Sequence, residues 1–140
     1  MTLRFLLVLT YKHAYSNEDA ITCSLVLCSV SDQGSALKEI KRVLNHNGGT
    51  FGYVEHMAVN LENNEEKGLS FLELQQRALD PLQQAVAHNC HLHRDTDNVI
   101  SSAFGVDGSG SAKVLETERF LIEDMWPVSC QCSGVVKLNG

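Results

Sequence analysis

The stretch from Asp19 to Glu55 constrains the fold more than any other part of the chain. It reads DAITCSLVLCSV, then SDQGSALKEIKRVLNHNGG, then TFGYVE. An apolar run, an amphipathic segment that ends at Gly48 and Gly49, and a second apolar run predict a strand, a helix and a strand. Because a helix joins them, the two strands should lie parallel in one sheet.

The first strand of this unit is predicted over Asp19–Ser24. Its apolar character continues through Leu25–Leu27, which is typical of a strand covered on both faces. Ser31 or Asp32 can cap the following helix, because a side-chain oxygen there accepts a free N–H of the first turn. The buried stripe of that helix is predicted from its spacing to contain Ala36, Leu37, Ile40, Val43 and Leu44.

The remaining elements complete an α/β order. A helix is predicted over Leu69–Ala87, with Pro81 expected to kink it or divide it. A short helix capped by Asp95 follows, and then two strands, Ala112–Glu123 and Val128–Leu138, joined as a hairpin. The predicted order is β-α-β-α-α-β-β, parallel first and antiparallel at the end, which is an α/β fold.

The N-terminal residues are interpreted as separate from this domain. Residues 1–18 contain a short apolar run, which favours a strand over Leu3–Thr10 because it is too short for the apolar region of a signal peptide, about 7–15 residues. We therefore divide the chain into an N-terminal remnant, 1–18, and a domain, 19–140.

Composition excludes some classes of function. A formal net charge of -6 and the lack of a basic run argue against binding to nucleic acid. Five cysteines, an odd number at irregular spacings, argue against a disulfide framework and favour a reducing, intracellular compartment. No apolar stretch reaches the length of roughly 18 residues that spans a bilayer.

Several of these runs resemble a known family. LVLCSV, EIKRVL with its following Gly-Gly, and VEH are similar to the second half of class I S-adenosylmethionine-dependent methyltransferases, nearest to the type 11 methyltransferase domain. Within that domain the residues resemble methyltransferase-like protein 7, a group of thiol methyltransferases. LDPLQQAV, NCHLHRDT and SGVVK resemble the same group, so the resemblance covers Asp19–Lys137. It implies a partial Rossmann-like methyltransferase fold that contains strands 4-5-7-6 of a sheet ordered 3-2-1-4-5-7-6.

The cofactor-binding motifs of that family have no counterpart here. Residues 1–18 contain no glycine, so the glycine-rich turn after the family's first strand is missing. The acidic residue that binds the ribose hydroxyls is missing too. Because ligands of open α/β sheets bind at the switch point between strands one and four, half of that crevice is absent. We expect a truncated domain that is weakly active or inactive and binds little or no S-adenosylmethionine.

The resemblance also implies candidate site residues at two strand ends. Ser24, Leu25 and Val26 would line the methionine part of the cofactor pocket, unless they simply end a buried strand. His56 would be the catalytic residue that takes a proton from a thiol or hydroxyl nucleophile, since imidazole ionises near neutral pH. The alternative is that Glu55 and His56 only satisfy local hydrogen bonds.

One cluster invites a metal interpretation. His88, Cys90, His91 and His93 lie within six residues, whereas zinc sites usually combine two close pairs separated by a longer insertion. We therefore predict no metal site, and keep metal binding around His88–His93 as a third alternative function.

The other cysteines are interpreted mainly through packing. Cys130 and Cys132 project from the same face of a predicted strand, which favours a place in the core. Cys23 and Cys28 are interpreted either as small buried apolar residues or as reactive thiols.

The predicted function is methyl transfer from S-adenosylmethionine to a small-molecule acceptor, with a thiol as the acceptor that the resemblance suggests. The alternative is a non-catalytic interaction module, or a degenerate paralogue, that pairs through an open sheet edge. Association with endoplasmic reticulum or lipid-droplet membranes, as against a cytoplasmic location, is implied by the resemblance alone.

Overall fold

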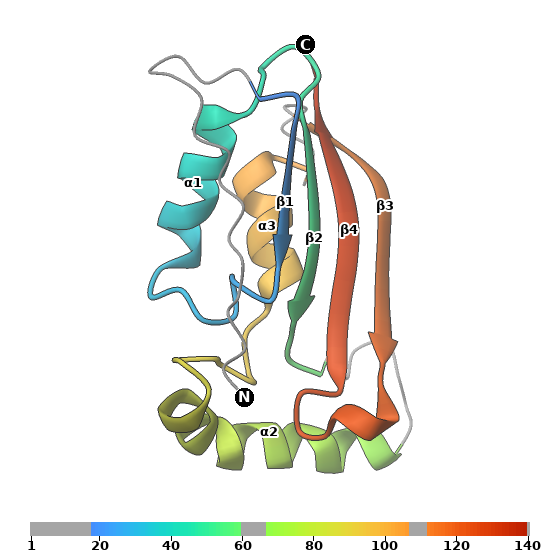
Figure 1. Ribbon diagram of the computed structural model, residues 1–140. Coiled ribbons are helices and arrows are strands. Elements are labelled where there is room, and N and C mark those ends of the chain that lie inside the picture. Colours follow the sequence, from blue (N-terminus) through green and yellow to red (C-terminus); the bar gives the residue numbers. More distant parts are fainter. Residues whose placement is uncertain (1–17, 60–66, 107–111, 140) are drawn as a thin grey trace.

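The computed structural model describes residues 18–59, 67–106 and 112–139, so the predicted strand at Leu3–Thr10 lies outside the described residues. The elements follow the predicted order (Figure 1). They are β1 (Ala20–Ser24), α1 (Gln33–Val43), β2 (Thr50–His56), α2 (Lys67–Val86), α3 (Thr96–Phe104), β3 (Ala112–Leu121), the short 3-10 helix η1 (Glu123–Met125) and β4 (Cys130–Leu138).

The four strands form one sheet in the order β1-β2-β4-β3. β1 and β2 are parallel, with Ser24 opposite Val54, and β4 runs antiparallel to both β2 and β3. In the numbering of the methyltransferase sheet this order is 4-5-7-6, so the fold predicted from the resemblance is confirmed. η1 lengthens the hairpin connection, so the strands end earlier and begin later than predicted.

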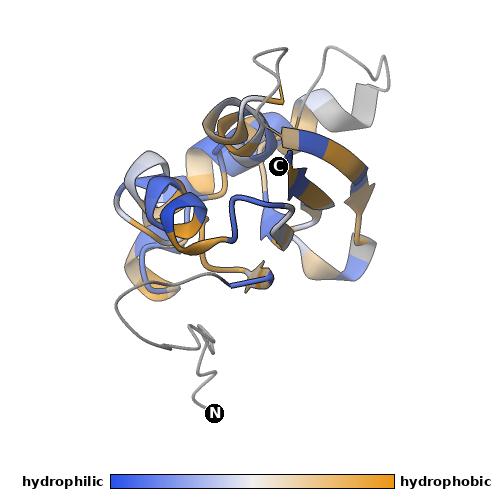
Figure 2. Ribbon diagram, turned by 90° about the horizontal axis from the view of Figure 1, so that it is seen from above, coloured by the Kyte–Doolittle hydropathy of each residue, from blue (hydrophilic) through white to orange (hydrophobic). Residues whose placement is uncertain are grey.

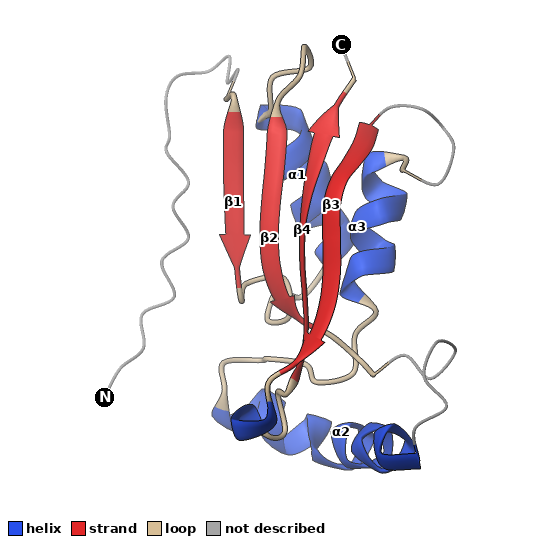
Figure 3. Cartoon of the chain, turned by 90° about the vertical axis from the view of Figure 1, so that its right-hand side faces the viewer, coloured by secondary structure: helices blue, strands red, loops and turns tan. Residues whose placement is uncertain are grey.

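Helices α1 and α3 pack against one face of the sheet (Figures 1 and 3). The core lies between these helices and the sheet. It is built from residues with almost no exposed surface: Leu37, Leu44, Phe51, Ile100 and Phe104. The rings of Phe51 and Phe104 stack with centroids 5.3 Å apart. Full burial of a side chain of this size contributes about 1.5–3 kcal/mol to folding, so these contacts fix how α1 and α3 lie on β2.

The prediction that β1 is covered on both faces is wrong for the described residues. Cys23 is buried while Thr22 and Ser24 are exposed, which is the alternation of a strand with one covered face. No described helix lies on the other face of the sheet (Figure 3). The continuous apolar run misled the prediction because the residues after Ser24 belong to a turn and not to the strand.

Helix α1 begins where the sequence indicated. Asp32 is the N-cap, and its Oδ1 accepts a hydrogen bond from the Ser35 N–H at 3.1 Å. Leu37 and Leu44 of the predicted stripe are fully buried, and Ala36 and Ile40 pack against the same core. Viewed from above, hydrophobic and hydrophilic stretches alternate around the helices (Figure 2), as expected for helices with one buried side.

Helix α2 lies across the end of the sheet toward which β1 and β2 point (Figures 1 and 3). It continues through Pro81 as one element and is not divided. α3 begins after Asp95, the predicted cap, whose side chain makes no capping hydrogen bond. Within the described ranges, no helix is both long enough and apolar enough to cross a membrane.

Candidate functional site

β1 and β2 end side by side, and the segments that follow them form the candidate site. β1 ends at Ser24, and β2 continues two residues past the partner of Ser24, to His56. Because the strands are parallel, both carboxyl ends lie at one edge of the sheet, the edge crossed by α2 (Figure 1). Open α/β sheets bind their ligands at this edge.

A sharp turn follows β1. Leu25 has a φ of 54°, a left-handed conformation that costs a non-glycine residue about 1–3 kcal/mol. Its N–H donates to the Val54 carbonyl at 2.9 Å, which closes the pairing with β2. Ser24, Leu25 and Val26 therefore lie at the carboxyl end of β1, where the resemblance placed them, and their contact with a cofactor stays a prediction.

The buried carboxylate of Glu55 holds this turn. Glu55 has no exposed surface. Its Oε1 accepts hydrogen bonds from the Val26 N–H at 3.0 Å and from the Cys23 thiol at 3.2 Å, and its Oε2 accepts from the Cys28 N–H at 3.2 Å. Backbone N–H groups that a longer strand would have paired in the sheet are thus satisfied by one side chain. Glu55 is a positioning residue that the sequence analysis treated only as a strand-end partner of His56.

Two further side chains hold the next part of the same loop. Arg94 Nη1 donates to the carbonyl oxygens of Leu27 and Val30, at 3.0 and 2.6 Å. Gln33 Nε2, from the first turn of α1, also donates to the Leu27 carbonyl at 3.1 Å. The segment between β1 and α1 is therefore a fixed wall, because its polar groups are bonded to β2, to the first turn of α1 and to the loop before α3.

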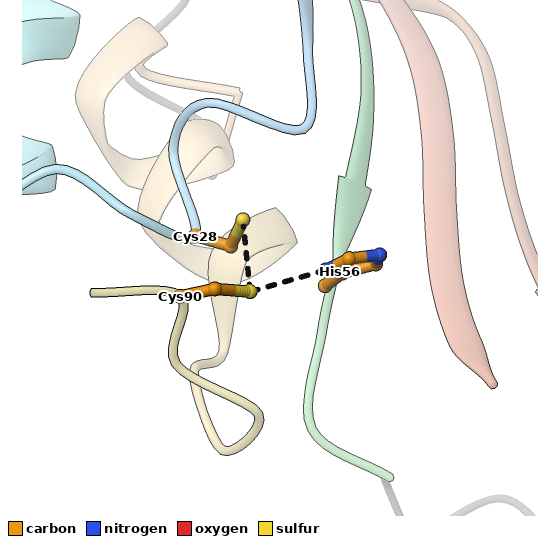
Figure 4. Close-up of side chains that lie close together, drawn as sticks. All are labelled: Cys28, His56 and Cys90. Atoms are coloured by element: carbon orange, nitrogen blue, oxygen red, sulfur yellow. Dashed lines mark hydrogen bonds between the residues drawn. The ribbon is translucent and has the colours of Figure 1, made fainter. Parts of the chain in front are cut away.

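Cys28, His56 and Cys90 converge beside this wall from distant parts of the chain (Figure 4). Cys90 Sγ lies 3.3 Å from His56 Nδ1 and 3.5 Å from Cys28 Sγ. All three residues are buried, and their side-chain ligand atoms lie within 4.8 Å of one another. The sequence analysis named each of these residues but did not group them.

His56 keeps one ring nitrogen without a partner. Nδ1 faces Cys90, whereas Nε2 is buried and has no hydrogen-bond partner within the described part of the chain. A buried polar atom of this kind is rare in a folded protein unless a ligand or water satisfies it. The alternative that Glu55 and His56 serve only local hydrogen bonding accounts for the bonds of Glu55 but leaves His56 Nε2 unexplained.

The loop after α2 brings Cys90 to this position. His88 and Asn89 have positive φ values of 51° and 64°, which reverse the chain after the helix. Asn89 Nδ2 donates to the Ser29 carbonyl at 3.0 Å, and the His91 N–H donates to the Cys28 carbonyl at 2.9 Å. These bonds fasten the two cysteine-bearing segments to each other through groups other than the sulfur atoms.

The two thiols have opposite ionisation behaviour. The hydrogen bond between the two thiols lowers the pKa of Cys90 to about 7, against the effect of burial. The same contact, together with burial, raises the pKa of Cys28 far above its usual value. Burial and the neighbouring Glu55 also raise the pKa of Cys23. Of the two predicted interpretations, Cys23 therefore fits a neutral, buried thiol.

The histidines around Cys90 point to other partners. His91 Nδ1 lies 3.5 Å from Asp80 Oδ2, and His93 Nε2 lies 3.9 Å from Glu73 Oε1. His88 is exposed. The short run His88–His93 therefore contributes only Cys90 to the buried cluster, since neighbouring residues in a loop face different directions.

Cys130 and Cys132 lie in the hydrophobic core, as predicted. Both are buried, with 8% and 0% of their surface exposed, and both belong to the core cluster of apolar side chains. Burial raises the pKa of Cys132 to about 12. These two residues take no part in the site at the ends of β1 and β2.

The fold is that of S-adenosylmethionine-dependent methyltransferases. One solved structure of that class, from Methanosarcina mazei, matches 91% of this chain and 63% of its own length, with a TM-score of 0.58 and 12% identity. The structure of the cyclase SpnF matches 91% of this chain and 53% of its own, with a TM-score of 0.54 and 12% identity. At such identity the likeness shows the fold alone, and one fold can carry different reactions.

The sequence comparisons support a more specific resemblance. The sequence model for the type 11 methyltransferase domain matches residues 11–51. Thiol S-methyltransferase TMT1B of Rattus norvegicus is 38% identical over 90 residues, which are 64% of this chain and 34% of that protein. Thiol S-methyltransferase TMT1A of Homo sapiens is 33% identical over 85 residues, 61% of this chain and 32% of that protein. The chain therefore resembles the thiol methyltransferase group, as predicted, and matches about a third of the length of these relatives.

Proposed function

We propose that the ends of β1 and β2 form part of a site that transfers a methyl group from S-adenosylmethionine to a small-molecule thiol. The resemblance to type 11 methyltransferases and to named thiol S-methyltransferases supports this reaction class. Two observations at the ends of these strands carry the proposal: Glu55 holds the turn Ser24–Val26, and His56 Nε2 is buried without a partner in the described part of the chain. The site thus combines a rigid backbone wall with one unsatisfied group that can exchange a proton.

The described residues fit one side of the cofactor. S-adenosylmethionine supplies an activated methyl group on a positively charged sulfur. Ser24, which is exposed at the end of β1, and the half-buried Leu25 and Val26 would line its methionine part. Residues 1–18 contain no glycine-rich turn for its carboxypropyl end. We therefore expect the 140-residue chain to bind S-adenosylmethionine more weakly than micromolar, because much of the positioning is missing.

His56 is the proposed proton acceptor in the metal-free chain. Its Nε2 takes the proton of the acceptor thiol as the thiol sulfur forms its bond to the methyl carbon and the bond from that carbon to the cofactor sulfur breaks. Nδ1 stays against Cys90 Sγ, 3.3 Å away, which fixes the ring orientation. General base catalysis of this kind raises a reaction rate about 10²–10⁴-fold, so the imidazole should account for a large part of the rate enhancement.

An assay of labelled methyl transfer tests the proposal. The purified chain at high concentration, given methyl-labelled S-adenosylmethionine and a small alkyl thiol, should form labelled thioether slowly but faster than the protein-free mixture. His56→Gln should lower the rate at least about tenfold, while His46→Gln, at an exposed histidine, should not. A wild-type rate equal to that of the protein-free mixture would overturn the proposal.

The open edge of β1 favours one alternative function. β1 is the outer strand of the described sheet, beside β2 only. An outer strand carries unpaired backbone groups that invite a second strand. If the chain is an interaction module, light scattering should give the mass of a dimer, and Thr22→Lys on β1 should weaken the association. A monomer at every concentration would exclude self-association through this edge.

A further inference from the structure

We propose that Cys28, His56 and Cys90 bind one zinc ion through their two sulfur atoms and the imidazole Nδ1. The three side chains come from the loop after β1, the end of β2 and the loop after α2, and they meet in one buried place (Figure 4). This ligand set differs from the local run of histidines that the sequence suggested, because only Cys90 is shared by the two groups.

The spacing of the three ligand atoms suits a tetrahedral metal. Zinc–sulfur bonds of about 2.3 Å and a zinc–nitrogen bond of about 2.0 Å at the tetrahedral angle place two sulfurs about 3.8 Å apart and sulfur and nitrogen about 3.5 Å apart. The observed separations are 3.5 Å between the sulfurs and 3.3 Å between Cys90 Sγ and His56 Nδ1. The two separations that involve Cys90 are therefore a few tenths of an ångström shorter than those in a zinc site, and all three ligand atoms lie within 4.8 Å of one another.

The backbone around the ligands is fixed without help from the metal. The Cys28 N–H is bonded to Glu55 Oε2 and the Cys28 carbonyl to the His91 N–H. The His56 carbonyl accepts a hydrogen bond from Thr96 Oγ1 at 3.2 Å. A site whose ligands are already held loses little conformational freedom when the ion binds, which favours affinity.

The chemistry of the donors selects zinc. Thiolate and imidazole are soft or borderline ligands that suit zinc and do not suit magnesium or calcium. Two thiolates balance the charge of the ion in this buried position, and their two protons leave to solvent on binding. The described residues offer three ligands, which is the number that catalytic zinc sites use when they leave the fourth position for water or a substrate.

An open fourth position would suit the thiol of the proposed reaction; this point rests on the proposed function. The acceptor thiol would displace the bound water, lose its proton to solvent and stay as a thiolate on the ion, because zinc binds deprotonated thiols. In a metal-bound chain His56 would be a ligand through Nδ1 and would carry its proton on Nε2, and the ion would supply the charge that ionises the thiol.

Metal analysis of the reduced chain tests the inference without cofactor or thiol substrate. The chain is loaded with zinc under argon, freed of excess ion and analysed for zinc and protein. We expect one zinc per chain, and cobalt loaded in its place should show intense thiolate-to-cobalt absorption and the visible bands of tetrahedral cobalt. Cys28→Ser, Cys90→Ser and His56→Ala should each weaken zinc binding at least about tenfold, as losses around a metal typically do.

Cys130→Ser is the matched control, because Cys130 is also a buried cysteine but lies outside the cluster. It should retain zinc like the wild-type chain. Circular dichroism of each variant identifies any that fail to fold, and the wild-type stoichiometry does not depend on them. No retained zinc in the wild-type chain, or an equal loss in Cys130→Ser, would overturn the inference. A Cys28–Cys90 disulfide as the stable state of a chain kept under reductant would also overturn it.

The experiments can distinguish a failure of the zinc inference from a failure of the proposed function. Zinc binding with no methyl transfer would keep the inference and contradict the proposed reaction. Methyl transfer that survives Cys28→Ser but not His56→Gln, in a chain that retains no zinc, would keep the proposed base and contradict the metal site.

Discussion

Two groups of buried cysteines in this chain have different surroundings. Cys28 and Cys90 come from loops 62 residues apart and meet a histidine and several hydrogen-bonded polar groups. Cys130 and Cys132 lie on one strand among apolar side chains of the core. Burial alone therefore does not indicate the chemistry of a cysteine, whereas the convergence of polar groups from separate segments indicates a functional role.

The segments around Glu55 contain features that lower the stability of a fold. A fully buried carboxylate, a leucine with positive φ and two consecutive left-handed residues all occur next to the Cys28 cluster. Strained backbone and buried charge destabilise a fold unless the surroundings compensate, and they concentrate at functional sites. In the described residues the hairpin of β3 and β4 has no non-glycine residue with positive φ, which suits a structural role.

The largest expected effect on stability comes from Glu55→Gln. The amide cannot accept at both ends, so its NH₂ group would face a backbone N–H that the carboxylate now satisfies. Leaving such groups unpaired in the interior costs about 1–3 kcal/mol, and more where the lost acceptor is charged. Urea denaturation should show a loss in this range. Glu118→Gln, at an exposed position on β3, should change the free energy of unfolding by less than about 0.5 kcal/mol.

The next largest effect on stability distinguishes the two groups of cysteines. Cys132 is fully buried and its sulfur has no hydrogen-bond partner within the described chain, so Cys132→Ser should cost about 1–3 kcal/mol by burying an unpaired hydroxyl. Serine at position 90 can still bond to Cys28 and His56, so Cys90→Ser in the metal-free chain should cost less than about 1 kcal/mol. Equal losses in the two variants would contradict the distinction drawn between the groups.

The smallest effect concerns Asp80, which anchors the loop that carries Cys90. Its Oδ1 accepts a hydrogen bond from the Leu92 N–H at 2.5 Å and its Oδ2 accepts from Gln84 Nε2 at 2.5 Å. Burial acts to raise the pKa of Asp80, but these hydrogen bonds outweigh it and lower the pKa below its usual value. A lowered pKa means that Asp80 stabilises the fold above the pKa it has in the unfolded chain, and that this stability is lost as the pH falls through the folded value.

We therefore expect stability measured by urea denaturation to fall at acidic pH, and to fall less steeply in Asp80→Asn. At neutral pH this variant should lose about 1 kcal/mol, the usual worth of such hydrogen bonds. Asp124→Asn, at an exposed aspartate in η1, serves as the control. An unchanged acid dependence in Asp80→Asn would show that Asp80 does not anchor the loop.

Much of the fold could be predicted from residues close together in the sequence. The spacing of Leu37 and Leu44, the cap at Asp32 and the glycines before β2 are local patterns, and each marks an element that the structure contains. The strand order followed from the resemblance and is confirmed. The end of β1 at Ser24 is confirmed. The prediction that β1 is covered on both faces was wrong because the apolar run continues into the turn at Leu25, which depends on Glu55 of another strand.

The candidate site was harder to predict because its residues meet only in three dimensions. A search for metal ligands along the sequence favours close neighbours such as His91 and His93, but the rings of these two lie near the carboxylates of Asp80 and Glu73 instead. Cys28 and Cys90 give no spacing motif. The one sequence cue was that Cys28 follows a strand whose carboxyl end faces the ligand edge of the sheet.

We propose that the cofactor binds at the polar end formed by β1 and β2, and not at the hairpin of β3 and β4. An NMR titration of the ¹⁵N-labelled chain with S-adenosylmethionine tests it most directly, since amide shifts report even weak binding by residue. We expect progressive shifts at Ser24, Leu25 and Val26 and at His56, with no shifts along the core of β4. Shifts confined to other regions, or none at the highest soluble concentration, would contradict it.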